Sequence, residues 1–491
     1  RLAAAPAQER LNKVISDMRA EIERLRQEHV ALRADIRKRY PEYAELIDPK
    51  PVGISDVRKA LAPGEALVSI YLGESQSYVW TIAAGGKAAF RVVPLKRTEI
   101  ESDVRELRHA MEFGAGSQAQ LQPFDLARAH RLYRAFFEAD EALWKDAQVL
   151  NVIPHGALGQ LPFALLVTAA PAQQPTAGTQ AEVPWLIRKV ALAQLPSANA
   201  FAALRRAPPG KAGREPFIGF GDPLFTAAAA GGTQVRAVRN LAVQKAADTT
   251  EERLSALAQG NRPQQPTAAP AMPTLSQAFA LLSALPDTAE ELRQIAVVLK
   301  ADQSRDVFLN REATEKNVKQ AQLENRRVVA FATHGITAGQ LTGLDQPALA
   351  LSNPALTGDG DNDGFLTMEE VLGLKLDADW VVLSACNTAA EDGRGSEAVS
   401  GLGRAFFYAG ARSLLVSNWA VETTSARLLT TELFRRQSGN PQITRAEALR
   451  QSMLALMERH AVDPATGRPL FSYAHPTFWA PFALVGDGGA R

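Results

Sequence analysis

Three short apolar runs constrain the fold of this chain more than any other feature. They are RVVAFATHG at 327–335, DWVVLSAC at 379–386 and SLLVSNWAV at 413–421. Nearly continuous apolar runs of this length are typical of strands that are buried on both faces of a sheet. Helical stretches separate the runs, and strands that alternate with helices indicate a mostly parallel α/β sheet with helices on both sides.

The rest of the chain divides into further elements of the same kind. Strands are predicted at ALVSIYLG, SYVWTIAA, FRVVPL, VLNVIPHG and IRKVALAQL, and helices at 98–113, 124–145 and 285–299, the last capped by Asp287 or Thr288. FIGFGDP opens a second block near residue 217, and residues 226–275 read as a mobile insertion rich in Ala, Gly, Gln, Thr and Pro. We therefore expect three parts: a helical segment at 1–48, a first half at 49–210 and a second half at 211–491.

The two predicted halves carry a short internal echo. VLNVIPHGALGQL and VVAFATHGITAGQL both place His-Gly at the end of an apolar strand. Only the second is followed by a strand that ends in cysteine. A duplicated domain with one degenerate copy explains this pattern.

Residues 9–40 are predicted to form one helix. The residues of its a/d seam alternate spacings of three and four, at Ile15, Met18, Ile22, Leu25, His29, Leu32 and Ile36. The seam fits a helix docked on its own domain, or a partner-facing or oligomerising helix, or the last helix of a repeat array. The chain begins RLAAAPAQER, without methionine, which favours a piece of a longer protein over the product of signal-peptide removal.

Composition excludes several classes of protein. The 54 basic and 53 acidic residues nearly cancel, so nothing indicates a nucleic-acid or membrane-surface footprint. No apolar run approaches the roughly 18 residues that a membrane helix needs. A single cysteine, Cys386, excludes an intrachain disulfide and fits a reducing compartment, so we expect a cytoplasmic location, with a periplasmic or secreted one as the alternative.

Cys386 and His334 are the candidate catalytic residues. Both follow predicted strands, and the carboxyl ends of strands are where α/β sheets form their active sites. A cysteine nucleophile needs an imidazole that takes its proton or holds it as thiolate. The histidine comes about 50 residues before the cysteine, which is the caspase-like order. The backbone N–H groups of Gly335 and Cys386 are candidates for the oxyanion hole.

These residues, taken with their neighbours, resemble a known family. FATHG, VVLSACNT, GLGRAFFYAGARSLLVSNWAV and HPTFWAPFALVGD occur in the order found in the CHAT-domain family, whose members are caspase-like and associated with tetratricopeptide repeats. The resemblance covers roughly residues 41–487. It implies a caspase-haemoglobinase fold with a pseudo-caspase half and an active half, a dyad at His334 and Cys386, and an upstream repeat or sensor. Bacterial signalling is an expectation at the level of the family.

The resemblance also directs attention to the segment after the SLLVS strand. In this superfamily that segment contributes to the first specificity pocket, which here implicates Asn418, Trp419 and Glu422. A carboxylate in a partly dry pocket favours an Arg or Lys side chain through charge-assisted hydrogen bonds. We therefore expect a preference for a basic P1 residue, with surface charge as the alternative role of Glu422.

DGDNDGFLTMEE at 359–370 matches the EF-hand calcium loop at each diagnostic position. The predicted ligands are Asp359, Asp361, Asp363, the Phe365 carbonyl, Thr367 and Glu370, and Gly364 supplies the sharp turn. A true EF-hand has a helix before the loop, whereas ALALSNPALTG reads as strand and turn. The alternative is therefore an exposed turn before an acidic helix start. If calcium binds here, we expect it to order the rim of the active site.

The sequence thus predicts a caspase-like cysteine endopeptidase that needs no cofactor for its chemistry and acts on a protein substrate. Two rivals use the same fold: a catalytically silent signalling scaffold, and a calcium-responsive binding module whose catalytic residues are vestigial. A serine hydrolase is disfavoured because no G-x-S-x-G elbow occurs.

Overall fold

The computed structural model divides the chain into two compact units, residues 1–53 and 54–491. The residues that it describes are 13, 16–18, 20–28, 31, 52–111, 123–170, 180–227, 275–384, 401–419, 421–462, 466 and 468–490. Cys386 and nearly all of the predicted insertion at 226–275 lie outside these residues.

The first unit contains the predicted N-terminal helix. Its described residues between 13 and 31 are helical, and Arg24 pairs with Glu21 and Glu28 on successive turns. Three residues of the predicted apolar seam, Met18, Ile22 and Leu25, are exposed, whereas Ile15, His29, Leu32 and Ile36 lie outside the described residues. A helix is confirmed between residues 13 and 31, whereas its predicted extent over 9–40 and the contacts of its seam stay predictions.

The second unit is built on one large sheet. Its eleven strands follow the order β3-β2-β1-β4-β5-β16-β13-β12-β8-β6-β7. In chain order the strands of this sheet are β1 (Glu65–Leu72), β2 (Ser77–Ala83), β3 (Ala88–Val93), β4 (Val149–Ile153), β5 (Ala191–Gln194), β6 (Ile218–Pro223), β7 (Val307–Asn310), β8 (Val328–Ala332), β12 (Trp380–Leu383), β13 (Ser413–Ser417) and β16 (Phe482–Gly486).

The sheet is mostly parallel, as the sequence predicts, but it contains two groups of opposite direction. Strands β6, β7, β8, β12 and β13 run parallel to one another. Strands β1, β4, β5 and β16 form the other parallel group. Because β13 and β16 are antiparallel, the carboxyl ends of β4 and β5 lie at the opposite edge of the sheet from those of β8 and β12.

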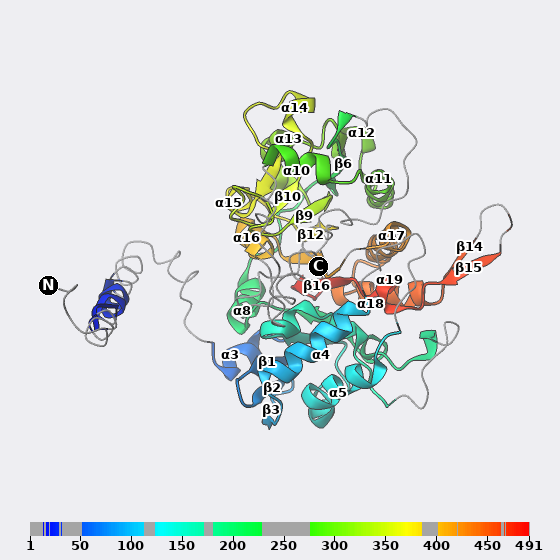
Figure 1. The fold of residues 1–491 in the computed structure, drawn as a ribbon. Helices are drawn as coiled ribbons and strands as arrows, with labels where there is room; N and C mark the ends of the chain where they lie inside the picture. Colours follow the sequence, from blue (N-terminus) through cyan, green and yellow to red (C-terminus); the bar gives the residue numbers. More distant parts are fainter. Residues whose placement is uncertain are drawn as a thin grey trace, which may run out of the picture. The chain divides into compact units, whose positions relative to one another are not determined.

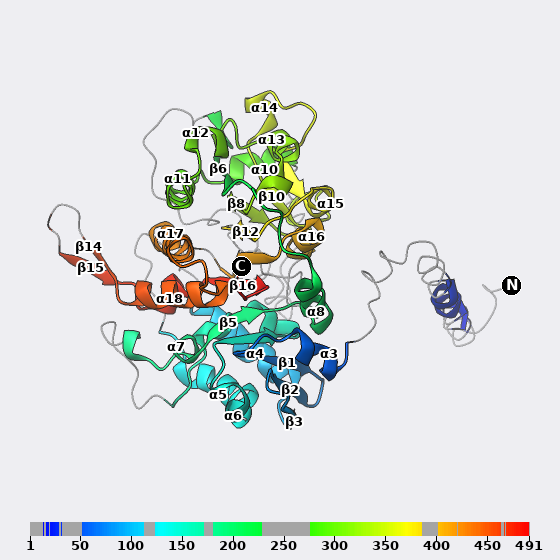
Figure 2. The ribbon, with the colours of Figure 1, turned by 180° about the vertical axis from the view of Figure 1, so that it is seen from behind.

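Helices cover both faces of this sheet. Figure 1 shows α11 and α17 on one side of the central strands and α15 and α16 on the other, and Figure 2 shows the same arrangement from behind. The helices of the second unit are α3 (Ile54–Ala60), α4 (Arg97–His109), α5 (Leu126–Phe136), α6 (Glu141–Trp144), α7 (Leu186–Lys189), α8 (Ala198–Arg206), α10 (Leu275–Leu281), α11 (Asp287–Leu299), α12 (Gln303–Asp306), α13 (Glu315–Gln320), α14 (Pro354–Thr357), α15 (Met368–Leu372), α16 (Gly401–Ala409), α17 (Thr423–Gly439), α18 (Arg445–Met457) and α19 (Pro476–Trp479).

The apolar runs are continuous because both faces of each central strand are buried. In β8, Ala330 packs into the core under α11 and α17, whereas its neighbours Val329 and Phe331 pack into the core under α16. In β12, Val381 and Val382 divide in the same way. Successive side chains of a strand point to opposite faces, so only an unbroken apolar run fills both cores.

The strand pair β4–β5 repeats the register of the strand pair β8–β12. Val152 lies opposite Gln194, and Phe331 lies opposite Leu383. His155 and His334 each follow their strand by the same number of residues. In the partner strands, Ser197 stands as far after Gln194 as Cys386 stands after Leu383 in the sequence. The echo in the sequence therefore corresponds to a repeated pair of strands.

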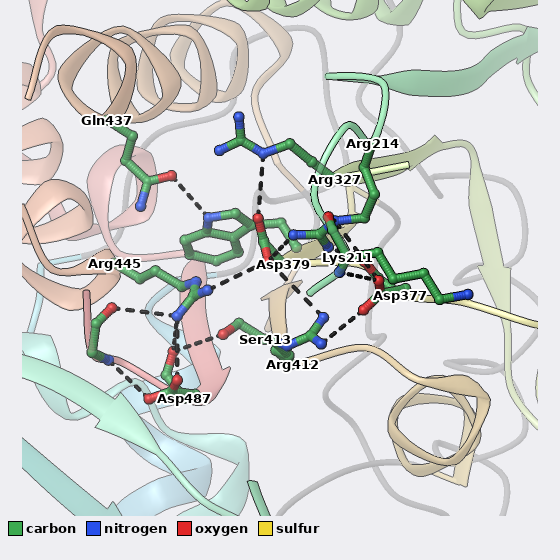
Figure 3. A network of polar contacts seen from close by, with 12 residues as sticks. Lys211, Arg214, Arg327, Asp377, Asp379, Arg412, Ser413, Gln437, Arg445 and Asp487 are labelled. Atoms are coloured by element: carbon green, nitrogen blue, oxygen red, sulfur yellow. Dashed lines mark hydrogen bonds and ion pairs between the residues drawn. The ribbon is translucent and has the colours of Figure 1, made fainter. Parts of the chain in front are cut away.

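A network of ion pairs and hydrogen bonds lies at the edge of the sheet where β8, β12 and β13 begin (Figure 3). Asp379, just before β12, accepts from Arg214 at 3.0 Å and from Arg327 at 3.4 Å. Arg445, which is 2% exposed, lies 3.9 Å from Asp379 and 3.3 Å from Asp487, beyond β16. Because Arg214 lies on the connection between β5 and β6, the network ties both halves of the sheet together.

Local structure departs from the sequence predictions at several points. The helix predicted at 124–145 is divided into α5, a 3-10 turn at Glu138–Asp140 and α6. The predicted strand IRKVALAQL begins with helix α7, and only Ala191–Gln194 form β5. Helix α11 begins after Pro286 without a side-chain cap, because the Thr288 hydroxyl instead donates to the Leu285 carbonyl and accepts from the Asp222 N–H. Among the described residues, no helix has both the length and the apolar character that crossing a membrane requires.

Candidate active site

His334 lies at the carboxyl end of β8, where the sequence predicts it. It opens the short strand β9 (His334–Ile336) of a second sheet, which also contains β10 (Ala348–Ala350) and β11 (Phe365–Thr367). His334 pairs with Ala350 across this sheet and is 1% exposed. A buried histidine in a strand has little freedom to reorient. A catalytic base requires such a fixed orientation.

The contacts of the His334 ring define its protonation pattern. Nε2 lies 2.8 Å from the carbonyl oxygen of Ser283, and the Phe225 ring centre lies 5.4 Å from the ring. A carbonyl oxygen only accepts, so Nε2 carries the proton and Nδ1 is the basic nitrogen of the neutral ring. A backbone carbonyl on one ring nitrogen is the usual way in which a protein sets the tautomer of the other.

Cys386 lies outside the described residues, but the strand end that leads to it is well defined. Ser384, two positions earlier, is buried, and its hydroxyl lies 3.2 and 3.4 Å from the carboxylate oxygens of Glu291 on α11. Glu291, which is 1% exposed, also accepts from Thr430 on α17. Sequence reasoning missed this carboxylate, because only the packing of α11 on the sheet brings it to Ser384. The pairing of His334 with Cys386 stays a prediction.

Gly335 lies beside His334 on β9, opposite Leu349 of β10. It is only partly buried, so its backbone borders the surface at this edge of the sheet. Its predicted partner in the oxyanion hole, the N–H of Cys386, lies outside the described residues. The oxyanion hole therefore also stays a prediction.

The three residues of the predicted specificity pocket have defined places after β13. Asn418 is buried, and its backbone N–H and side-chain amide both donate to the Pro481 carbonyl. Trp419 is 2% exposed, and its indole N–H donates to Thr477 at 3.1 Å. Glu422 is the N-cap of α17 and accepts from the backbone of Thr424 and Ser425. These contacts fix the segment, and its role in substrate binding stays a prediction.

Glu422 belongs to a group of carboxylates at the edge of the sheet where β6, β8 and β12 end. Thr423 donates to Asp287, the first residue of α11, at 3.0 Å. Burial raises the pKa of Asp222, at the end of β6, to about 6, and the nearby Asp287 adds to the shift. Because Gly221 pairs with Ala332, Asp222 ends the strand directly beside the one that carries His334. Sequence reasoning missed Asp222, although FGDP at a strand end is a signal that could have found it.

The loop at 359–370 follows α14 and consists of a turn, strand β11 and the first residues of α15. Asp359 is buried and accepts from Asn362, Asp363 accepts from the Phe365 N–H, and Asp361 is exposed. Phe365 lies in β11, whose backbone pairs with β10. Within the described part of the chain, no three His, Cys, Asp or Glu side chains group in a way that would hold a metal ion. Calcium binding stays a hypothesis from the sequence.

Thr367 and Glu370, the last two predicted ligands, form a capping box. The Thr367 hydroxyl caps α15, and one carboxylate oxygen of Glu370 accepts from the Thr367 N–H and hydroxyl. The other carboxylate oxygen binds Lys319 of α13 at 2.8 Å. Both oxygens of this carboxylate are therefore already engaged by the protein.

Comparison with known proteins identifies the family. A model of the CHAT domain matches residues 126–487, and the chain therefore belongs to the CHAT-domain family. No curated protein sequence matches the chain.

Two solved structures are similar to this chain. One is the Arg-specific cysteine proteinase gingipain R, with a TM-score of 0.37, 11% identity, and coverage of 80% of this chain and 75% of that one. The other is the Saccharomyces cerevisiae separase–securin complex, with a TM-score of 0.43 and 8% identity. The match to it covers 88% of this chain but 30% of that one. At these identities the likeness concerns the fold alone.

Proposed function

We propose that this protein is a caspase-like cysteine endopeptidase that cleaves a partner protein with His334 and Cys386. The observation that carries the proposal is the setting of His334. It is buried at the carboxyl end of β8, one strand from the strand that leads to Cys386, and the Ser283 carbonyl holds its proton on Nε2. A histidine whose tautomer is set in this way has Nδ1 as its basic nitrogen, and an imidazole is the group that a cysteine nucleophile needs.

The proposed chemistry follows from these roles. Nδ1 of His334 takes the proton of the Cys386 thiol, and the thiolate attacks the peptide carbonyl carbon. The oxyanion of the tetrahedral intermediate accepts hydrogen bonds from the N–H groups of Gly335 and Cys386. The imidazolium then protonates the leaving amine, which leaves a thioester. Water, deprotonated by His334, hydrolyses the thioester to the carboxylate and restores the thiol.

The same site supports a preference for a basic P1 residue. Asp222, Asp287 and Glu422 bring three carboxylates to the carboxyl edge of the sheet, and a half-buried carboxylate binds a guanidinium through charge-assisted hydrogen bonds. We expect Glu422→Gln, which retains a capping oxygen, and Asp222→Asn each to slow labelling by a P1 Arg reagent more than by a P1 Leu reagent. Equal slowing with both reagents would argue against this preference.

The decisive experiment is intact-mass labelling with a peptidyl electrophile. The chain has a single cysteine, so each added mass reports on Cys386. Fast labelling of the wild type that collapses in His334→Ala is the expected result. Slow labelling at the same rate in both proteins would mean an ordinary thiol and would contradict the proposal.

One observation favours the rival function of a binding scaffold. The face of β1, β2 and β3 exposes Tyr71, Phe90 and Val92, and the rings of Tyr78 and Trp80 lie 6.2 and 5.1 Å from that of Phe90. An exposed apolar patch of this kind commonly marks an interaction site. Partner binding that survives Cys386→Ala would support this reading.

A further inference from the structure

The feature that carries a further inference is the position of Lys319. This residue lies on α13, and its ammonium nitrogen is 2.5 Å from Glu315, 2.8 Å from Glu370 and 3.0 Å from Asn362. Asn362 and Glu370 belong to the loop at 359–370. A lysine ammonium has three N–H donors and no acceptor, so these three oxygens match its full capacity.

These oxygen atoms are of the kind that a bound cation requires. Glu315 is 1% exposed and brings a negative charge to the base of the loop, and Glu370 supplies the residue that the EF-hand pattern reserves for bidentate binding. A buried carboxylate needs a positive partner or a proton. Burial and the nearby Glu370 raise the pKa of Glu315 to about 7, while Lys319 opposes that rise.

We propose that Lys319 is the built-in cation of this loop and a positioning residue for His334. In this role the ammonium takes the place that the sequence pattern assigns to calcium. The loop then keeps its shape without a metal ion. The effect on His334 rests on the peptidase activity proposed above, whereas the effect on the loop does not.

The first link from Lys319 to His334 runs through Glu315 and Gly364. The second carboxylate oxygen of Glu315 accepts from the Gly364 N–H at 2.9 Å. Gly364 has a φ of +84°, and a Cβ there would lie 2.8 Å from the Phe279 ring. Only glycine allows both the backbone conformation and this close approach. Lys319 thus holds the carboxylate that fixes the turn.

Two routes continue from this turn to the histidine. Phe365 pairs with Ala350, and Ala350 pairs with His334 across the small sheet. The Phe365 ring also stacks on Phe279 with centres 4.9 Å apart. Phe279 lies in the last turn of α10, which ends at Leu281, and the carbonyl of Ser283 just beyond it holds Nε2 of His334. A shift of the turn therefore reaches both the backbone and the ring of His334.

Hydrogen exchange measured by mass spectrometry tests the proposal without relying on activity. The variant is Lys319→Met, which keeps the length of the side chain and removes its charge. The control is Lys316→Met, on the same helix, where the side chain is exposed. In Lys319→Met we expect segments 279–285 and 359–372 to exchange about three- to tenfold faster, and in Lys316→Met at the wild-type rate. Lys319→Arg should restore part of the protection, and Glu370→Gln should lose part of it.

Calcium provides the second arm of the experiment. Added calcium should leave exchange of the wild type unchanged, because Lys319 already binds Glu370, the carboxylate that the EF-hand pattern reserves for bidentate coordination. Slower exchange of segment 359–372 in the wild type on addition of calcium would show that calcium is the cation of this loop and would overturn the proposal. Hydrogen exchange in Lys319→Met at the same rate as in the wild type would also overturn the proposal.

Labelling of Cys386 tests the link to His334. In Lys319→Met the maximal labelling rate should fall about fivefold, while the reagent concentration at half-maximal rate stays the same, since the histidine and not the binding surface is displaced. Faster exchange with an unchanged maximal rate would overturn the positioning role. A wild type that does not label at all would contradict the proposed peptidase, and the exchange result would still decide the role of Lys319 in the loop.

Discussion

The strand pairs β4–β5 and β8–β12 carry a histidine at the same register and place it in different surroundings. Nδ1 of His155 accepts from the Leu72 N–H at 3.3 Å, and Tyr71 lies against the ring with centres 4.3 Å apart. In His334, Nε2 is hydrogen-bonded to the carbonyl oxygen of Ser283. Both rings thus carry the proton on Nε2, and they differ in which nitrogen the backbone contacts: an amide N–H on Nδ1 of His155 and a carbonyl oxygen on Nε2 of His334.

The partner strands β5 and β12 lead to different residues at the matching position, Ser197 and Cys386. Ser197, which matches Cys386 in register, caps α8 by accepting from the Ala200 N–H at 3.1 Å. A hydroxyl committed to a helix end is a structural group. The comparison teaches that one strand arrangement can place its histidine and the residue opposite in different contacts, and in the first half both contacts are structural.

The largest expected effect separates the two histidines by activity. His334→Ala should reduce the rate of Cys386 labelling about 10²- to 10⁴-fold, the usual contribution of a positioned base. His155→Ala should leave that rate within about twofold, because its ring lies at the opposite edge of the sheet. A similar loss in both variants, measured by intact mass, would break the distinction between the halves.

The second effect concerns the junction of the halves. Asp379→Ala leaves the buried Arg445 without one of its two carboxylate partners, so we expect a loss of about 3–5 kcal/mol in the free energy of unfolding. Asp140→Ala, within the first half, leaves Arg91, which is 23% exposed and still reaches water, so its loss should be smaller, about 1–2 kcal/mol. Urea unfolding curves followed by circular dichroism compare the two, and equal losses would contradict a special role for the junction.

A smaller effect tests the structural use of Ser197. Ser197→Ala should cost about 1 kcal/mol through the lost cap of α8, and Ser197→Asp should preserve the cap. Neither variant should change labelling of Cys386. Thermal unfolding and the labelling assay on the same samples give both answers, and slower labelling in Ser197→Ala would show that the first half takes part in the reaction.

The smallest effect is a pH dependence at Asp222. The carboxyl group loses its proton near pH 4 in the unfolded chain and at about pH 6 in the folded one, so ionisation between these values makes folding less favourable as pH rises. Asp222→Asn removes that ionisation and keeps an oxygen for Asn310. The variant should therefore melt at a higher temperature than the wild type at pH 7.5, with a smaller difference at pH 4. A larger difference at pH 4 would contradict the assigned cause.

Local patterns predicted the strands and the position of His334, because burial on both faces of a sheet leaves a mark in consecutive residues such as Val328–Ala332. Contacts between segments far apart in the chain have no such local pattern, so the sequence did not predict them. The carbonyl that sets the His334 tautomer comes from Ser283, 51 residues earlier, and the carboxylate under Ser384 comes from Glu291. The ammonium in the acidic loop comes from Lys319, which no motif connects with residues 359–370. Pattern reading found the loop and not its partner.

The position of β16 has a consequence for the order of events during synthesis. This strand follows the other strands of the large sheet in the chain, yet it lies between β5 and β13, where the two groups of strands meet. Until residues 482–486 leave the ribosome, β5 and β13 each have an unpaired edge, and unpaired edges invite wrong pairing. The strand that joins the two groups is therefore made last, after both His155 and His334.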